Sequence, residues 1–113
     1  MGYGKLISNQ QIIHAINDNY PVVVGMQVFD SFDRLHSSDS IVKMPAETNI
    51  VHKGHALCLV GYSIPESRFL AKNSFGKEWG DNGYCSIPFD YAENYIFDRW
   101  VFDINNQQIA YVV

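Results

Sequence analysis

The stretch GHALCLVGY, Gly54 to Tyr62, decides the fold together with KNSFGKEWGDNGY, Lys72 to Tyr84, which follows it after a short turn. The first stretch contains an apolar run that follows His55, and a short apolar run of this kind is typical of a buried β-strand. The turn and the run Arg68–Lys72 predict a second strand, paired with the first as an antiparallel hairpin. We therefore expect His55, at the start of one strand, to lie beside Asn73, at the end of its neighbour.

Segments on the N-terminal side predict one helix and a further strand. Ser8 and Gln11 form a capping-box pattern before an apolar helical face, which predicts a helix over residues 8–18. A β-branched run predicts a buried strand over residues 21–29. Residues 30–53 follow as a long polar connection, and connections of this length often lie at functional surfaces.

On the C-terminal side, a glycine-marked loop over residues 73–83 precedes a short strand, Tyr84–Ile87. Pro88 to Tyr95 is expected to be irregular or a brief helix, and residues 100–104 and 109–113 to form a closing hairpin. One helix with five or six antiparallel strands predicts an α+β fold. We expect a mainly antiparallel sheet, partly closed into a barrel, with the single N-terminal helix packed at its edge.

Composition limits the classes of function. The chain has 113 residues, of which 47% are hydrophobic and 18% charged, enough apolar material for the core of one domain spanning residues 1–113. Eight Lys and Arg against twelve Asp and Glu give a net charge of −4, which predicts no surface for nucleic acid or for an anionic membrane. No apolar run approaches the roughly 20 residues that span a bilayer, and no signal-peptide pattern follows the first residues. Composition leaves the cellular compartment open.

The histidines raise the question of a metal site. His14, on the predicted helix, and His36, in the connection, have no companion residue and are expected to be surface or structural. His52, His55 and Cys58 are zinc ligands by residue type. However, residues three apart in a strand point to opposite faces, which separates the last two. We therefore expect no metal.

The expected pairing of His55 with Asn73 has a chemical consequence. If the asparagine side-chain oxygen accepts a hydrogen bond from one imidazole nitrogen, it sets both the tautomer and the orientation of the ring. The other nitrogen is then free to take a proton from a nucleophile.

These motifs resemble the C-terminal half of the papain-like cysteine peptidases, the C1 family. In that family the catalytic histidine opens a His-Ala-apolar-Gly-Tyr strand, and the catalytic asparagine begins Asn-Ser-Trp-Gly-x-x-Trp-Gly-x-x-Gly-Tyr. Here the second motif reads NSFGKEWGDNGY from Asn73, and the resemblance extends over residues 8–104. It implies the β-rich right-hand domain of the papain-like fold and hydrolysis of a peptide or protein substrate. It also implies His55 and Asn73 as catalytic residues, with no cofactor.

The resemblance further implies where a substrate binds. Gly25 and Gly54 fall where the family lines its side-chain pocket, and glycines there would leave that pocket roomy. Phe75 replaces the tryptophan that shields the histidine–asparagine hydrogen bond from water, and Trp79 belongs to the same substrate-binding region. Trp79 and the neighbouring glycines can also be retained for packing alone, because they shape the loop that carries Asn73.

One part of the family's site is missing from the sequence. In the family, the nucleophilic cysteine belongs to a helical N-terminal half with a Gln-x-x-x-x-x-Cys-x-x-Cys-Trp-type segment, and nothing like that segment occurs here. Cys58 and Cys85 are expected to be inert core residues, so we expect the chain to be inactive alone. Three interpretations stay open: half of a peptidase that acts with a helical half, a non-catalytic binding or regulatory module, and a piece of a longer enzyme.

A chain without the helical half is expected to expose apolar surface around His55, Phe75 and Trp79. Large exposed apolar patches usually mark interfaces, so we expect a helical half-domain or a second copy of the chain to cover this one. The connection 30–53 and the terminal hairpin are the segments expected to exchange or to cover the patch, because they are extended and loosely anchored.

Overall fold

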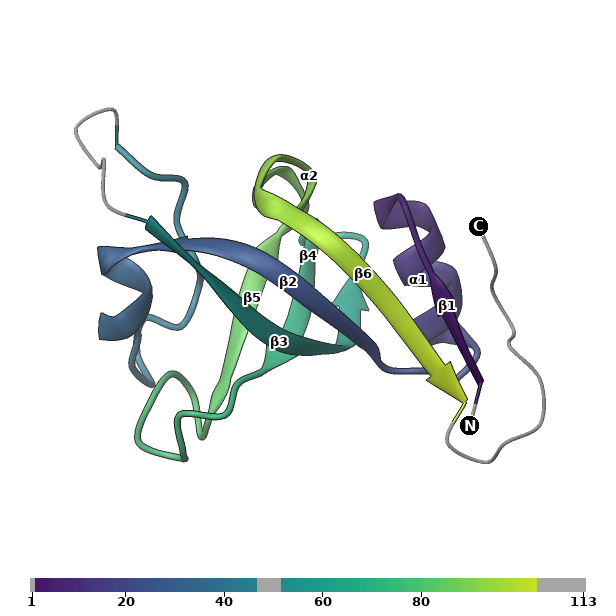
Figure 1. Ribbon diagram of the computed structural model, residues 1–113. Coiled ribbons are helices and arrows are strands. Elements are labelled where there is room, and N and C mark those ends of the chain that lie inside the picture. The colour runs from purple at the N-terminus through teal and green to yellow at the C-terminus, as the bar shows by residue number, and fades with distance from the viewer. Residues whose placement is uncertain (1, 47–51, 104–113) are drawn as a thin grey trace.

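A six-stranded antiparallel sheet forms the body of the protein (Figure 1), so the α+β class expected from the sequence is confirmed. The computed structural model describes residues 2–46 and 52–103. The strand order in the sheet is β1-β6-β2-β3-β4-β5, and every neighbouring pair is antiparallel. The elements are β1 (Gly2–Lys5), α1 (Asn9–Asn17), β2 (Val22–Phe29), the 3₁₀ helix η1 (Asp30–Arg34), β3 (His52–Ser63), β4 (Arg68–Lys72), β5 (Tyr84–Pro88), α2 (Phe89–Tyr95) and β6 (Ile96–Asp103).

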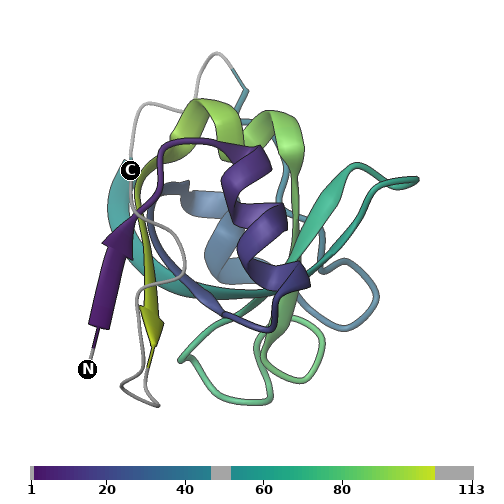
Figure 2. The same ribbon diagram turned by 90° about the vertical axis from the view of Figure 1, so that its right-hand side faces the viewer.

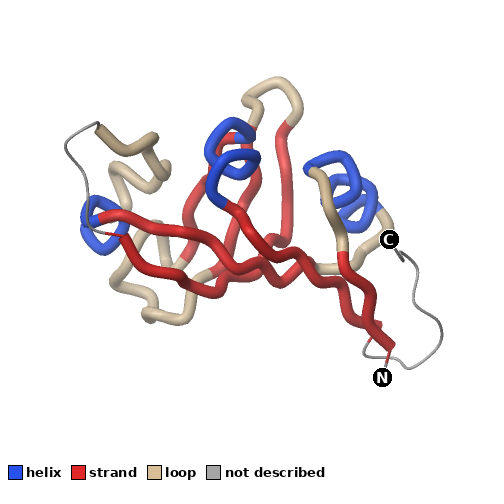
Figure 3. Tube along the Cα trace, turned by 45° about the horizontal axis from the view of Figure 1, so that its top comes forward, coloured by secondary structure: helices blue, strands red, loops and turns tan. Residues whose placement is uncertain are grey.

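The sheet is curved but open. Its edge strands, β1 and β5, are not neighbours in the strand order, so the expected partial closure into a barrel is corrected to an open sheet. The edge of β5 is covered instead by the chain after η1, where Ile41 forms a parallel bridge with Ser86. Both α-helices lie on one side of the sheet, which curves around them (Figures 2 and 3). We call that side the inner face and the opposite side the outer face.

Helix α1 begins where the capping pattern predicts. The Ser8 hydroxyl accepts a hydrogen bond from the Gln11 backbone N–H at 3.2 Å. The Gln11 side-chain oxygen accepts in turn from the Ile7 N–H at 2.7 Å, one residue earlier than a standard capping box. Ile12 and Ala15 are fully buried, so the predicted apolar face is the one that packs on the sheet.

Several elements extend beyond the sequence-based expectation. Strand β1 was not expected, because a four-residue segment with two glycines carries almost no strand signal. It is held in place by antiparallel pairing with β6, which lies near the other end of the chain. Strand β3 begins at His52 and β6 at Ile96, each earlier than predicted. Pro88 to Tyr95 contains the brief helix α2, so the structure has two α-helices in the described residues rather than one. Of the expected closing hairpin, residues 100–103 belong to β6, and residues 104–113 lie outside the described residues.

The core lies between the inner face and the helices. In β2 every second residue from Val22 to Val28 is buried, and in β3 the buried positions are Leu57 and Leu59. Tyr91 of α2 is buried against them, and its hydroxyl donates to the Gln27 carbonyl at 2.7 Å. This strict alternation determines which side chains of β3 face the helices and which face away from them.

Candidate active site

The hairpin β3–β4 brings His55 and Asn73 together. His55 lies near the start of β3, and Asn73 is the first residue after β4. His55 Nε2 lies 2.6 Å from Asn73 Oδ1, so the predicted contact is confirmed. The Asn73 backbone N–H donates to the Gly83 carbonyl at 2.9 Å, which ties the two ends of the loop together.

A second hydrogen bond to Asn73 Oδ1 determines the tautomer of the histidine. The Ser74 backbone N–H, which can only donate, lies 2.9 Å from Oδ1, so this atom acts as the acceptor. His55 Nε2 must therefore carry the hydrogen that it shares with Asn73. In the neutral ring, Nδ1 is left as the unprotonated nitrogen, available as a base.

Aromatic rings enclose the imidazole. The centroid of the Phe75 ring lies 4.9 Å from that of His55, and the Phe32 ring of η1 lies 5.5 Å from it. Phe32 also packs at 4.9 Å on Trp79, whose indole N–H donates to the Phe32 carbonyl at 2.9 Å. Helix η1 and the loop that carries Asn73 are thus held against one another on one side of the histidine.

This packing corrects two expectations. Trp79 is only 7% exposed, whereas Phe75 is 44% exposed, so of the two aromatic side chains only Phe75 contributes to the apolar surface expected around the histidine. The first part of the connection 30–53 is also well anchored rather than loose, because three of its side chains are buried: Phe32, Leu35 and Val42. The sequence signal for Phe32 was weak, since it is a single aromatic residue between Asp30 and Asp33 in a polar stretch.

The loop between β4 and β5 needs glycine at Gly80 and Gly83. Their φ angles are +60° and +89°, in the region that side chains disfavour. A Cβ at Gly80 would also collide with the carbonyl oxygen of Tyr84. These glycines allow the tight path that places Asn73 beside His55, in agreement with the packing role expected for them.

Neither cysteine has the accessible, electropositive surroundings that a nucleophilic thiol needs. Cys85 is buried, and burial raises the pKa of its thiol to about 12. Cys58 is half-buried on the outer face opposite Val23, and burial raises the pKa of its thiol as well, while nearby Lys72 opposes this shift. A raised pKa disfavours the thiolate, which is the reactive form.

The same alternation bears on the zinc hypothesis. His55 pairs with Met26, which is buried on the inner face, whereas Cys58 pairs with Val23, which is 38% exposed on the outer face. The expected separation of these two side chains is therefore seen. Across residues 2–46 and 52–103, no group of three or more His, Cys, Asp or Glu side chains is placed to hold a metal ion.

Among the described residues, none of the helices has the length and apolar character to cross a bilayer.

The space above Gly25 and Gly54 is occupied, in contrast to the roomy pocket expected there. These glycines lie on the neighbouring strands β2 and β3, and the ring of Phe97 covers both. A Cβ built at Gly25 would lie 2.8 Å from Phe97 Cε1, and one at Gly54 would lie 3.5 Å from Phe97 Cζ. Phe97 itself is 54% exposed. Hydrophobic periodicity in the sequence gave no reason to expect its ring over the two glycines.

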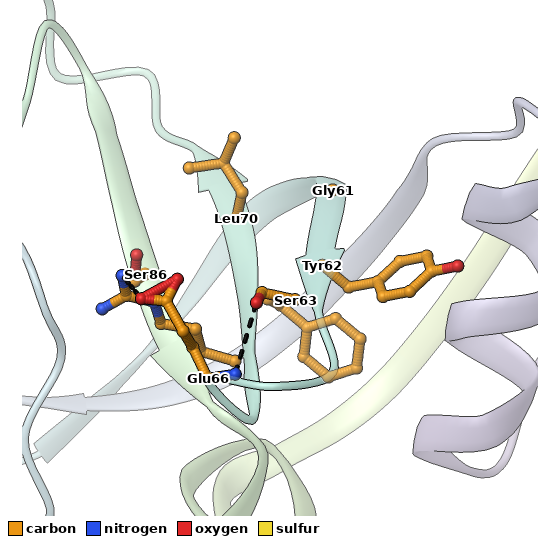
Figure 4. A pocket seen from close by; sticks show the side chains of 8 residues that line it. Gly61, Tyr62, Ser63, Glu66, Leu70 and Ser86 are labelled. Atoms are coloured by element: carbon orange, nitrogen blue, oxygen red, sulfur yellow. Dashed lines mark hydrogen bonds and ion pairs between the residues drawn. The ribbon is translucent and has the colours of Figure 1, made fainter.

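A separate hollow of about 300 Å³ lies at the other end of the hairpin, near its turn (Figure 4). Its charged groups satisfy each other. Arg68 Nη2 lies 2.8 Å from Glu66 Oε2, and the Glu66 backbone N–H donates to the Ser63 hydroxyl at 3.3 Å. Tyr62 points from this end toward α1, where its hydroxyl donates to Asn17. This hollow is distant along the strands from His55 and plays no part in the candidate site.

Comparison with known proteins agrees with this geometry. A family model described as papain family cysteine protease matches residues 1–101. The chain belongs to the papain family. An uncharacterized peptidase C1-like protein of Acanthamoeba polyphaga mimivirus is 37% identical over 95 residues, which are 81% of this chain and 30% of that protein. Pro-cathepsin H of Medicago truncatula is 35% identical over 82 residues, 71% of this chain and 23% of that protein.

Solved structures show the same fold. Xylellain, a cysteine protease from Xylella fastidiosa, matches with a TM-score of 0.78 at 24% identity, over 89% of this chain and 39% of that one. The bromelain protease from Ananas comosus matches with a TM-score of 0.64 at 19% identity, over 88% and 48% of the two chains. This papain-family chain spans less than a third of the curated relatives described above.

Proposed function

We propose that this chain provides the histidine and asparagine of a cysteine peptidase whose nucleophilic thiol comes from another polypeptide segment. The observation that carries the proposal is the 2.6 Å hydrogen bond from His55 Nε2 to Asn73 Oδ1, which leaves Nδ1 as the free base. Membership in the papain family supports the reaction type.

In the proposed reaction, the S–H proton of the nucleophile moves to His55 Nδ1. The sulfur then attacks the carbonyl carbon of a peptide bond, and the protonated imidazole returns its proton to the leaving amine. Asn73 acts by holding the ring in the orientation that points Nδ1 at the nucleophile. Water then releases the acyl group from the sulfur.

The isolated chain is expected to be inactive, because burial raises the pKa of both of its thiols and Cys58 lies on the face of β3 opposite to His55. The test is hydrolysis of a fluorogenic peptide by the chain alone and by the chain produced together with a cysteine-bearing helical half. We expect thiol-dependent turnover only in the second case, and a loss of about 10²–10⁴-fold in rate on His55→Ala. Hydrolysis by the isolated chain that disappears in Cys58→Ser or Cys85→Ser would contradict the proposal.

The inert cysteines also favour one alternative, a non-catalytic binding or regulatory module derived from a peptidase half. The two functions differ in what His55→Ala does to a complex with a helical half. In the peptidase it removes turnover and leaves assembly intact, whereas a binding module shows no turnover with either version.

A further inference from the structure

The aromatic rings around His55 differ in how firmly they are held. Phe32 is 1% exposed, and the centroid of its ring lies 5.5 Å from that of His55 and 4.9 Å from that of Trp79. Phe75 lies closer to the imidazole, at 4.9 Å, but is 44% exposed. The residue after it, Gly76, has a φ angle of +95°, and a Cβ built there would meet nothing within 4 Å. Phe75 therefore lies beside open space, whereas Phe32 is surrounded by packed side chains.

Helix η1, which carries Phe32, is tied to both elements of the candidate site. On the side of the loop after β4, the Trp79 indole N–H donates to the Phe32 carbonyl at 2.9 Å. On the side of β3, Lys53 Nζ lies 3.3 Å from Asp33 Oδ2. The ion pair is exposed and contributes little, so the buried indole hydrogen bond is the stronger tie. Through these contacts η1 is fixed relative to the strand that carries the histidine and to the loop that carries the asparagine.

The hydrogen bond to Asn73 does not by itself determine the direction of His55 Nδ1. It fixes the position of Nε2, but rotation of an imidazole about its Cβ–Cγ bond has no sharp minima. The lone pair of Nδ1 lies in the plane of the ring, so that plane decides where Nδ1 can accept a proton. An aromatic ring packed against the imidazole restricts the rotation, and a ring that is itself locked by packing restricts it more than an exposed one does.

We propose that Phe32, rather than the exposed Phe75, is the residue that positions His55, by holding the plane of the imidazole so that Nδ1 points at the nucleophile. The consequence for catalysis rests on the proposed function, whereas the effect on the ring exists in the chain alone. Phe32 is thus a positioning residue that acts through His55. Phe75 is the wall that can move, and Phe32 is the wall that stays in place.

The mobility of the His55 ring reports this effect directly. Nuclear magnetic relaxation of the ring C–H bonds, measured in the chain alone, gives an order parameter for the imidazole. We expect about 0.85 in the unmodified chain, as for rigid backbone, and less than about 0.6 in Phe32→Leu. Phe75→Leu removes the closer but exposed ring, and the imidazole should stay above about 0.8.

Phe89→Leu is the matched control. Phe89 also packs on an aromatic neighbour, since its ring centroid lies 4.8 Å from that of Phe69, but it belongs to α2. This variant should leave the order of the His55 ring unchanged. Backbone amide order parameters of β3 show in each variant whether the strand is intact. The unmodified chain keeps the proposal testable should Phe32→Leu not fold: the Phe32 ring should be more ordered than the Phe75 ring, and equal order overturns the proposal.

The remaining outcomes separate this inference from the proposed function. A His55 ring that stays ordered in Phe32→Leu, or that loses as much order in Phe75→Leu, overturns the inference. A loss of order shared by the backbone of β3 also overturns it, because Phe32 then acts only on stability. In a complex with a cysteine-bearing helical half, Phe32→Leu should lower kcat by at least about tenfold and leave KM unchanged. A complex that hydrolyses no peptide removes the proposed function and leaves the result on ring order standing.

Discussion

The two faces of the sheet differ in how completely their apolar side chains are buried. On the inner face, Phe69 and Leu59 are fully buried against the helices, and His55 is held between aromatic rings. On the outer face, Leu70 and Phe97 have similar chemistry and remain about half exposed. Burial of the inner face therefore stabilises the folded chain. The exposed apolar surface of the outer face adds to stability only when it is removed from water.

The largest expected effect comes from two neighbouring residues of β4 that point to opposite faces. Phe69→Ala leaves a cavity in the core and should lower the free energy of unfolding by about 3–5 kcal/mol. Leu70→Ala removes a side chain that is 41% exposed and should change it by less than about 0.5 kcal/mol. Urea denaturation of both variants measures the contrast. A large loss in Leu70→Ala would mean that the outer face is already covered in the isolated chain.

A smaller effect is expected where the inner face supports the candidate site. Trp79→Phe keeps an aromatic ring, but its phenyl group is smaller than the indole and lacks the N–H that donates to the Phe32 carbonyl. Because that carbonyl is left without its partner, we expect a loss of about 1–3 kcal/mol in unfolding free energy. Phe75→Leu, at the exposed ring on the other side of His55, is the control and should cost less. Equal costs for the two variants in urea would show that the indole hydrogen bond contributes nothing.

The smallest effect concerns pH. Burial raises the pKa of the Cys85 thiol from 9.0 to about 12 in the folded state. The unfolded chain therefore loses this proton at lower pH than the folded chain does. The stabilisation is complete below pH 9 and is lost as the pH rises toward 12. Wild type should lose more unfolding free energy above pH 9 than Cys85→Ala, in urea titrations at matched pH. Cys58 is only half-buried, so the pH dependence of unfolding free energy in Cys58→Ala should differ less from that of wild type. An equal difference for the two variants would contradict the contrast between the two thiols.

Sequence reasoning predicted the site better than the details of the fold. The contact between His55 and Asn73 could be predicted because both residues belong to one hairpin, whose register depends on a short turn and on local apolar pattern. The roles of Phe32 and Phe97 could not be predicted. Each reaches the site from a segment far away in the sequence, and a single phenylalanine carries no periodic signal.

The sequence by itself determined the α+β class, the family and the asparagine–histidine pair, because these depend on local motifs and on strand periodicity. The tertiary structure decided whether the sheet closes, which rings enclose the imidazole, and that the space over Gly25 and Gly54 is filled by Phe97. It also decided that Asn73 Nδ2 is buried beside an apolar hollow, with no hydrogen-bond partner among the described residues. These features depend on contacts between distant segments, and such contacts follow from how the faces of the sheet pack rather than from the order of residues along one strand.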